Sequence, residues 1–348
     1  MIAVGLSGGV DSAVAAALLL EQGHQLFGIT MTMLPGVDDS VAAEQVARHL
    51  GIPLHRVDLT EAFEQRIIIP FTQSYLSGET PNPCVRCNRL IKFGLLLEHA
   101  CALGADQLAT GHYARIVRDA DGQAHLYAAC DRRKDQSYFL AGIGQDALRR
   151  ALFPLGDISG KEEVRRLAHR FNLPVAAAKE SQDVCFLPNS GYAELLASRF
   201  AAPAPRGLIV HRSGKLLGRH DGFWRYTVGQ RKGLGIAWKE PLYVLKVHAA
   251  RNRVVVGEES CLYSPELLAD ELIWFGTPPT QPFEAHCKIR YRHAPVPCRV
   301  EPQALGMLRV LFHEPQRAVT PGQTLAIYRE DEVLGAGRIR DGEDDAEA

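Results

Sequence analysis

The sequence predicts an α/β N-terminal domain with a parallel sheet and helices on both faces, then a small α+β or β central domain and a C-terminal β-barrel. Three observations predict this fold class. Short apolar runs alternate with helical patterns in the first part of the chain, which is typical of βα units. Glycines and turn residues become frequent after residue 205. From residue 272 to residue 340 only strand patterns follow, which favours a small barrel.

The N-terminal elements follow in order. Apolar runs predict parallel strands at residues 2–6, 25–31, 54–59 and 106–110. Helical spacing predicts helices at residues 12–22, 40–50 and 89–103. A strand pair at 113–118 and 125–130 and a helix at 161–171 come next. Because ligands of such sheets bind at the carboxyl ends of the strands, the segment after the first strand is the first place to look for a site.

The second half of the chain is divided by its turns. Short apolar runs predict strands at residues 207–211, 242–247 and 253–256, and later at 285–291, 296–300, 307–312 and 324–328. The linker is Ala-Ala-Pro-Ala-Pro at 201–205. We therefore expect a catalytic domain at 1–200, a basic central domain at 206–263, a barrel at 265–340 and an acidic tail at 341–348.

Composition limits the class of protein. The chain has 348 residues, 46% of them hydrophobic and 23% charged, so two or three folded domains are expected. The sequence shows neither an apolar run of membrane-spanning length nor a basic leader, so we expect a cytoplasmic protein. In that compartment the eight cysteines indicate free thiols, metal binding or redox chemistry.

Basic residues gather in the middle of the chain. Residues 206–253 contain eleven Lys or Arg and two acids, whereas the last eight residues contain five acids and no base. A basic segment in a chain of net charge −1 is typical of a surface that binds a polyanion. Charge alone is equally compatible with an ordinary solvated surface.

The most specific motif is Ser7-Gly8-Gly9-Val10-Asp11-Ser12, between the first predicted strand and helix. Glycines let the backbone approach a phosphate closely, and the helix start adds its positive dipole end. The loop lacks the Gly-Lys-Ser/Thr ending of a Walker A loop. It resembles the PP-loop of ATP pyrophosphatases, which cleave ATP between the α and β phosphates and adenylate a substrate oxygen.

Three cysteines form the second signal. Cys84 and Cys87 follow Pro81 and Pro83, and a helix is predicted directly after them. A thiol at a helix start beside Arg86 is expected to have a lowered pKa. Cys185 lies about a hundred residues further on. The other interpretations are half of a zinc site, which needs four ligands, and for Cys185 a buried small apolar residue.

Taken together, these stretches resemble the family of bacterial tRNA-specific 2-thiouridylases over nearly the whole chain. The matching segments are residues 5–12, 80–93, 110–115, 134–138, 181–186, 227–235, 290–292 and 321–323, together with Met31. Their number and order make a chance match implausible.

The resemblance implies a reaction and its partners. ATP, with Mg²⁺, would adenylate the C2 oxygen of the wobble uridine of a tRNA, and sulfur would then displace AMP. The uridine would be flipped into the site. The cysteine at position 185 would carry a persulfide, and Cys87 would release the sulfur. The sulfur source would be a donor protein or inorganic sulfide.

Other roles carry over by resemblance, residue by residue. The nucleotide would be bound by Gly5, Leu6, Ser7, Gly8, Gly9, Val10, Asp11, Ser12, Met31 and Gly111. The target base would be contacted by Asn82, Pro83 and Cys84. The tRNA would be contacted by His112, Lys134, Asp135, Gln136, Arg290, Tyr291 and Gln323.

Cys84 departs from a common form of the family, which has Asp there. The change gives three thiols: Cys84, Cys87 and Cys185. Three thiolates can hold a 4Fe–4S cluster with one open iron that binds sulfide. The sequence favours this cluster, and persulfide chemistry on Cys87 and Cys185 remains the alternative.

Two other functions compete with tRNA thiolation. A PP-loop ligase or amidotransferase acting on a small molecule accounts for residues 7–12 but not for the three cysteines or the basic middle. A non-catalytic Fe–S or zinc protein that binds RNA accounts for the cysteines but not for the ATP loop. Pyrophosphate release that depends on tRNA separates tRNA thiolation from both.

Overall fold

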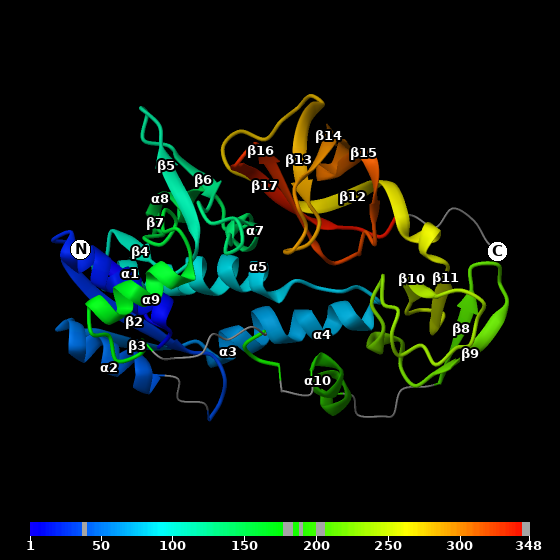
Figure 1. The fold of residues 1–348 in the computed structure, drawn as a ribbon, viewed down its shortest axis with the longest axis horizontal. Helices are drawn as coiled ribbons and strands as arrows, with labels where there is room; N and C mark the ends of the chain where they lie inside the picture. Colours follow the sequence, from blue (N-terminus) through cyan, green and yellow to red (C-terminus); the bar gives the residue numbers. More distant parts are fainter. Residues whose placement is uncertain (37–39, 177–183, 188–190, 200–205, 343–348) are drawn as a thin grey trace.

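The structure, a computed structural model, describes residues 1–36, 40–176, 184–187, 191–199 and 206–342. Figure 1 shows the N-terminal sheet at one end, the central domain at the other, and a barrel above the helices that connect them. The predicted linker at 201–205, residues 181–183 of the matching segment 181–186, and the tail from residue 343 onward lie outside the described residues.

The N-terminal sheet is parallel, with strand order β3-β2-β1-β4-β7. Its strands are β1 (Ile2–Gly5), β2 (Leu26–Thr32), β3 (Leu54–Asp58), β4 (Gln107–Ala109) and β7 (Ala151–Leu152). The first four confirm the predicted strands to within two residues. The central position of β1 places the loop at residues 7–12 in the middle of the carboxyl edge.

Helices cover both faces of this sheet. One face packs against α1 (Val10–Glu21), α2 (Ser40–Leu50) and α9 (Lys161–Arg170). The other packs against a second group of helical segments. These are α3 (Thr60–Phe63), η1 (Glu64–Ile68), α4 (Ile69–Leu76), α5 (Pro83–Cys87), η2 (Asn88–Leu96) and α6 (Leu97–Ala102). Shorter helices follow at α7 (Ser137–Leu140), α8 (Gln145–Arg150) and α10 (Tyr192–Arg199).

The predicted helix at 89–103 is longer and less regular than expected. It begins at Pro83 as α5, continues as the π-helix η2, and ends as α6. Pro83 is well placed at the first helical position, because its missing N–H would be unpaired there anyway. A second π-helix, η1, precedes α4. π-Helices are rare and frequently occur at functional sites.

The barrel is closed by six antiparallel strands, and its core is apolar. They are β12 (Tyr263–Trp274), β13 (Phe283–Lys288), β14 (Val296–Pro302), β15 (Leu308–Arg317), β16 (Thr324–Arg329) and β17 (Glu332–Ile339). Four match predicted strands, and β12 and β17 were not predicted. The hairpin β5 (Ala114–Arg118) and β6 (Ala124–Ala128) of the N-terminal domain pairs with β17. The barrel is thereby joined to the catalytic half.

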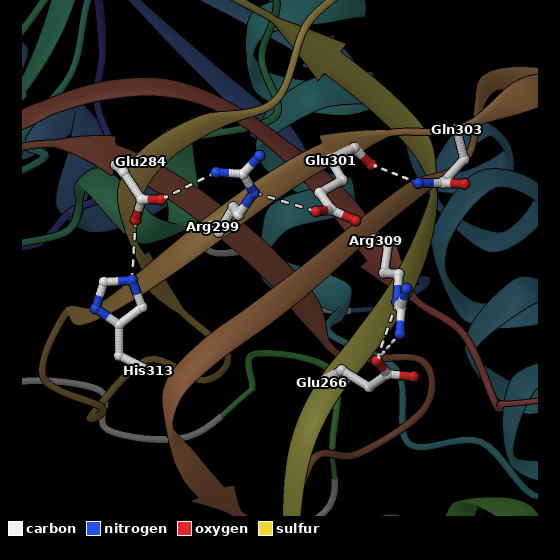
Figure 2. A network of polar contacts seen from close by, with 7 residues as sticks. All are labelled: Glu266, Glu284, Arg299, Glu301, Gln303, Arg309 and His313. Atoms are coloured by element: carbon white, nitrogen blue, oxygen red, sulfur yellow. Dashed lines mark hydrogen bonds and ion pairs between the residues drawn. The ribbon is translucent and has the colours of Figure 1, made fainter.

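The outer face of the barrel carries a ladder of ion pairs across neighbouring strands (Figure 2). Arg309 donates to Glu266, and Arg299 lies between Glu284 and Glu301. His313 contacts Glu284 at 2.9 Å. Exposed pairs like these contribute little stability. They pair the acidic and basic side chains of this face with one another. The basic segment predicted at residues 206–253 lies in the central domain, not on this face.

The central domain is a four-stranded sheet of order β10-β11-β8-β9. Its strands are β8 (Gly207–His211), β9 (Leu216–His220), β10 (Tyr243–His248) and β11 (Arg253–Gly257). Three were predicted, and β9 was not. The long connection between β9 and β10 holds Arg231 and Lys232, both exposed. Across the described residues, none of the helices has the length and apolar character needed to cross a membrane.

Candidate active site

Hydrogen bonds of its own two serines fix the conformation of the loop after β1. Ser7 N–H donates to Ser12 Oγ at 3.2 Å, and Ser12 Oγ in turn donates to the Gly9 carbonyl at 3.1 Å. Gly8 has φ +73°, and a Cβ there would lie 2.7 Å from the Cβ of Ala42. Glycine is therefore required at this turn. The backbone N–H groups that follow lead into α1, as an anion-binding loop needs.

Asp11, in the first turn of α1, is the charged centre of this loop. Lys161 Nζ lies 2.7 and 2.8 Å from its two carboxylate oxygens. The hydroxyl of Tyr113 donates to one of them at 2.6 Å. Lys161 is the first residue of α9, so three separate elements meet at one carboxylate. A Mg²⁺ ion bound with ATP would take most of its ligands from phosphate and water, and Asp11 is the carboxylate of the loop that could supply another.

Gly111 and His112 follow β4 and close the site from the neighbouring strand. A Cβ on Gly111 would lie 2.6 Å from the Ser12 nitrogen, so only glycine allows this contact. His112 Nδ1 lies 2.8 Å from Thr110 Oγ1, and the ring packs beside Phe93 and Phe153. Burial lowers the pKa of His112 well below its usual value. The imidazole is therefore neutral at physiological pH.

The helix α5 carries Cys84 and Cys87 and contacts η1, η2 and α7. Asn82 is its N-cap and accepts a hydrogen bond from the Val85 N–H at 3.4 Å. Cys87 is 8% exposed, and Cys84 is half-buried. Burial raises the pKa of Cys87 to about 12 and also raises that of Cys84. The predicted lowering of these pKa values is therefore wrong, because desolvation of the thiolate outweighs the helix start and the nearby arginines.

Cys185 lies close enough to interact electrostatically with both of these thiols. Its neighbour Phe186 is buried and packs edge-to-face on Phe63 and Phe71, with ring centroids 5.7 and 5.1 Å away. Cys185 itself is exposed. The described residues 184–187 are thus anchored on α3 and α4 while the thiol stays accessible. The predicted interpretation of Cys185 as a buried small residue is wrong.

The three thiols do not form a ready metal site. Within the described part of the chain, no group of three or more His, Cys, Asp or Glu side chains is placed to hold a metal ion. One thiol is buried, one half-buried and one exposed. The donor set therefore does not fit a 4Fe–4S cluster in this conformation.

The barrel fixes the segment that leads into α5. Gln323 Nε2 donates to the Thr80 carbonyl at 2.8 Å, and Thr80 N–H donates to the Pro321 carbonyl at 2.9 Å. Tyr291 packs on Phe139 of α7 with ring centroids 4.3 Å apart. Arg290 donates to the Arg317 carbonyl at 2.9 Å. Gln323, Tyr291 and Arg290, which the resemblance assigns to tRNA contact, thus lie at the junction between the barrel and the catalytic half.

Lys134, Asp135 and Gln136 lie in the connection from β6 to α7. Asp135 is 7% exposed and accepts hydrogen bonds from Ala129 N–H and from Ser137. Lys288 of the barrel lies 3.9 Å from the same carboxylate. Gln136 accepts a hydrogen bond from the Tyr113 N–H. The structure places Asp135 and Gln136 inside this junction, and Lys134 is half-buried beside them.

The basic central domain reaches the same place. Thr227 Oγ1 lies 3.5 Å from Thr80 Oγ1, and its N–H is fixed by Gln230 at 3.1 Å. Arg231 and Lys232 follow directly and are exposed. The first residues of the connection between β9 and β10 therefore lie beside the entry to α5.

Sequence reasoning missed three residues of this region. Tyr113 and Lys161 contact Asp11. The charge of Lys92 acts on Cys84, Cys87 and His112. Tyr113 and Lys92 lie within matched motifs, but Lys161 carries no local signal, because its partner is 150 residues away.

The parallel sheet, the glycine loop at its central strand and the carboxylate behind that loop define an ATP-pyrophosphatase type of α/β enzyme, extended by a barrel. Three family models match the chain. They are described as the tRNA methyl transferase HUP domain at residues 1–189, its PRC-barrel domain at 196–258, and an aminomethyltransferase beta-barrel domain at 264–339.

Relatives named tRNA-specific 2-thiouridylase MnmA match almost end to end. The one from Pelobacter propionicus is 57% identical, covering 98% of this chain and 99% of the relative. The one from Trichlorobacter lovleyi is 53% identical and covers 97% of each chain. A solved 4-thiouridine synthetase–RNA complex with bound ATP overlaps 57% of this chain and 49% of that one, at TM-score 0.35 and 19% identity. The chain belongs to the tRNA-specific 2-thiouridylase family.

Proposed function

We propose that this chain is an ATP-dependent sulfurtransferase that converts the C2 carbonyl of the wobble uridine in tRNA to a thiocarbonyl. The observation that carries the proposal is the loop at residues 7–12, with Asp11 and its partner Lys161 at the carboxyl edge of the sheet, in a chain whose α5 thiols interact electrostatically with Cys185. Relatives named 2-thiouridylase, similar over the full length, support it. The small-molecule ligase alternative leaves the thiols and the basic segment without a use.

The first step is adenylation. The C2 oxygen of the uridine attacks the α-phosphorus of ATP, the bond to the β-phosphate oxygen breaks, and pyrophosphate leaves. Residues 7–12 bind the leaving phosphates through backbone N–H groups. Lys161 supplies a positive charge where pyrophosphate develops, and Tyr113 fixes the carboxylate that holds Lys161. Met31 and Gly111 border the nucleotide in this proposal.

The second step is sulfur transfer. Cys185 carries a persulfide, delivered by a donor protein or built from inorganic sulfide with an oxidant. The Cys87 thiolate attacks the Sγ of Cys185, which forms a disulfide and releases hydrosulfide. Hydrosulfide attacks C2 and AMP leaves with the former carbonyl oxygen. A dithiol reductant then returns two electrons to the disulfide.

Substrate contacts divide into two groups. Asn82, Pro83 and Cys84 border the uridine, and His112, Lys134 and Arg290 lie on the path of the tRNA backbone. Asp135, Gln136, Tyr291 and Gln323 act indirectly, by holding the junction between the barrel and the catalytic half. Arg231, Lys232 and the rest of the basic segment 206–253 supply phosphate contacts.

The domain limits we propose are 1–200, 206–263 and 265–340. The 4Fe–4S route remains a separate hypothesis for the sulfur step. It requires the three thiols to gather, and iron and sulfide analysis after anaerobic purification tests it.

The test of this function is pyrophosphate release. With ATP and Mg²⁺, the protein should release pyrophosphate only when unmodified tRNA with a wobble uridine is present. Release stimulated by a small amine or acid without tRNA would support the ligase function instead. RNA binding without pyrophosphate release would support the non-catalytic one.

A further inference from the structure

Lys92 is a half-buried lysine on the thiol side of the helix that begins at Pro83. Two other lysines in protected positions are matched by carboxylates: Lys161 by Asp11 at 2.7 Å and Lys288 by Asp135 at 3.9 Å. Across the residues that the structure describes, Lys92 forms no ion pair with a carboxylate. A half-buried lysine without a carboxylate partner is available to interact with another anion.

The π-helix determines which partner Lys92 meets. In an α-helix with 3.6 residues per turn, Lys92 would lie about 140° around the axis from Cys87. η2 begins directly after Cys87 and spans Asn88–Leu96. Hydrogen bonds of a π-helix join residues five apart, so Lys92 is related to Cys87 as residue i+4 is related to residue i in an α-helix, slightly more than one turn along. The irregular helix thus moves the ammonium to the face of the thiols.

The charges around Lys92 are consistent with this position. Its positive charge is the strongest interaction that opposes desolvation of the thiolate at both Cys84 and Cys87. Arg86 lies on the other side of the helix, where it donates to the Arg66 carbonyl at 2.7 Å. Arg89 lines a cavity between α4, α5 and the barrel, as does Arg86. Neither arginine replaces Lys92.

We propose that Lys92 is the cation that stabilises the negative sulfur of Cys87 during sulfur transfer, and that the π-helix is the device that places it there. This inference rests on the proposed function. When Cys87 attacks Cys185, negative charge passes from Cys87 to the departing hydrosulfide. An ammonium held near Cys87 by the helix stabilises this charge. Lys92 takes no part in the attack on ATP.

The test separates the two steps in single turnovers with ATP, tRNA and a persulfide-loaded enzyme. Lys92→Met is expected to slow 2-thiouridine formation at least tenfold, while pyrophosphate release stays within about twofold of the wild type. Adenylated tRNA should accumulate. Lys92→Arg, which keeps the charge, should restore most of the sulfur-transfer rate. Arg89→Met removes a cation from the opposite face of the same helix and is the matched control.

Each outcome has a defined meaning. Normal thiolation by Lys92→Met would overturn the inference, as would a fall in pyrophosphate release by the same factor as thiolation. Equal loss in Lys92→Arg and Lys92→Met would show that shape, not charge, matters. Lys92→Gln replaces Lys92→Met if the methionine variant does not fold. Absence of 2-thiouridine with the wild type and with Arg89→Met would instead contradict the proposed function.

Discussion

Lys161 Nζ contacts both carboxylate oxygens of Asp11, at 2.7 and 2.8 Å, although the two residues are 150 positions apart in the chain. The pair joins the start of α9 to the start of α1 directly behind the glycine loop. An ion pair in this protected place is costly to break, because the remaining charge loses its partner. The pair therefore fixes the position of the loop at residues 7–12 relative to α9.

Removing either member of this pair should stop adenylation. We expect Asp11→Ala to abolish tRNA-dependent pyrophosphate release and Lys161→Met to slow it by about 100-fold, with tRNA affinity nearly unchanged. Arg165→Met, an exposed change on the same helix, is the control. Normal thiolation by Asp11→Ala would show that residues 7–12 do not bind the phosphates.

The hydrogen bond from Gln323 of the barrel to the Thr80 carbonyl should help to fix the position of α5, the helix that carries Cys84 and Cys87. Gln323→Leu leaves that carbonyl unpaired, so we expect a loss of stability of about 1 kcal/mol. The rate of thiolation should fall about three- to tenfold, because Asn82 and Cys84 lose their fixed position. Melting temperature and single-turnover rates measure the two effects. Unchanged thiolation would limit Gln323 to a structural role.

The thiols should differ sharply in reactivity. In the enzyme without tRNA, iodoacetamide should alkylate exposed Cys185 first and Cys87 last, because burial raises the pKa of Cys87 to about 12. The neutral buried thiol stabilises the fold fully below the unfolded thiol pKa of about 8.5, and this contribution is lost as pH rises towards 12. Mass spectrometry of the alkylated peptides gives the order. Fast alkylation of Cys87 at neutral pH would contradict the buried position.

The exposed basic residues between β9 and β10 should bind tRNA phosphates. The double variant Arg231→Glu with Lys232→Glu should weaken tRNA binding. The slope of the logarithm of the binding constant against the logarithm of the salt concentration should fall in magnitude by about two, because two phosphate contacts are lost. Arg149→Glu, an exposed change near α8, is the control. Truncation near residue 202 would be a poorer test, because it would expose the edge of β6 and the buried Asp135.

Cys84→Ala separates the two routes of sulfur delivery. With persulfide chemistry on Cys87 and Cys185, the variant should keep substantial activity, and iron content should not affect the rate. If the three thiols held a cluster, the variant would lose both iron and thiolation. Iron analysis after anaerobic purification, alongside thiolation rates, decides between these outcomes.

The sequence predicts most of the local structure near the ATP loop. The alternating apolar runs identify β1 to β4, and the glycine pattern of residues 7–12 identifies the turn between β1 and α1. Periodicity fails where the period itself changes. The π-helix η2 overlaps the helix predicted at 89–103. The π turns of η1, however, do not follow the spacing of 3.6 residues. The helical stretch from Thr60 to Leu76 was therefore not predicted.

Long-range contacts are the other part that sequence reasoning could not supply. The pairing of β6 with β17 brings residues 126 and 333 together, and no local pattern encodes such a partner. The pKa of Cys87 was predicted in the wrong direction for the same reason. The helix start and the arginines are visible in the sequence, whereas the packing that buries the thiol is not. Asp135 likewise follows a charged, polar stretch that is typical of an exposed loop, but its side chain is buried and lies 3.9 Å from Lys288 of the barrel.

The most direct test of the central claim is the nucleoside composition of tRNA after reaction with the purified protein, ATP, Mg²⁺, a persulfide donor and a dithiol reductant. We predict 2-thiouridine at the wobble position, formed with one AMP and one pyrophosphate for each sulfur, and none with Cys87→Ala. Thiolation that proceeds without ATP, or an active Cys87→Ala enzyme, would contradict the account.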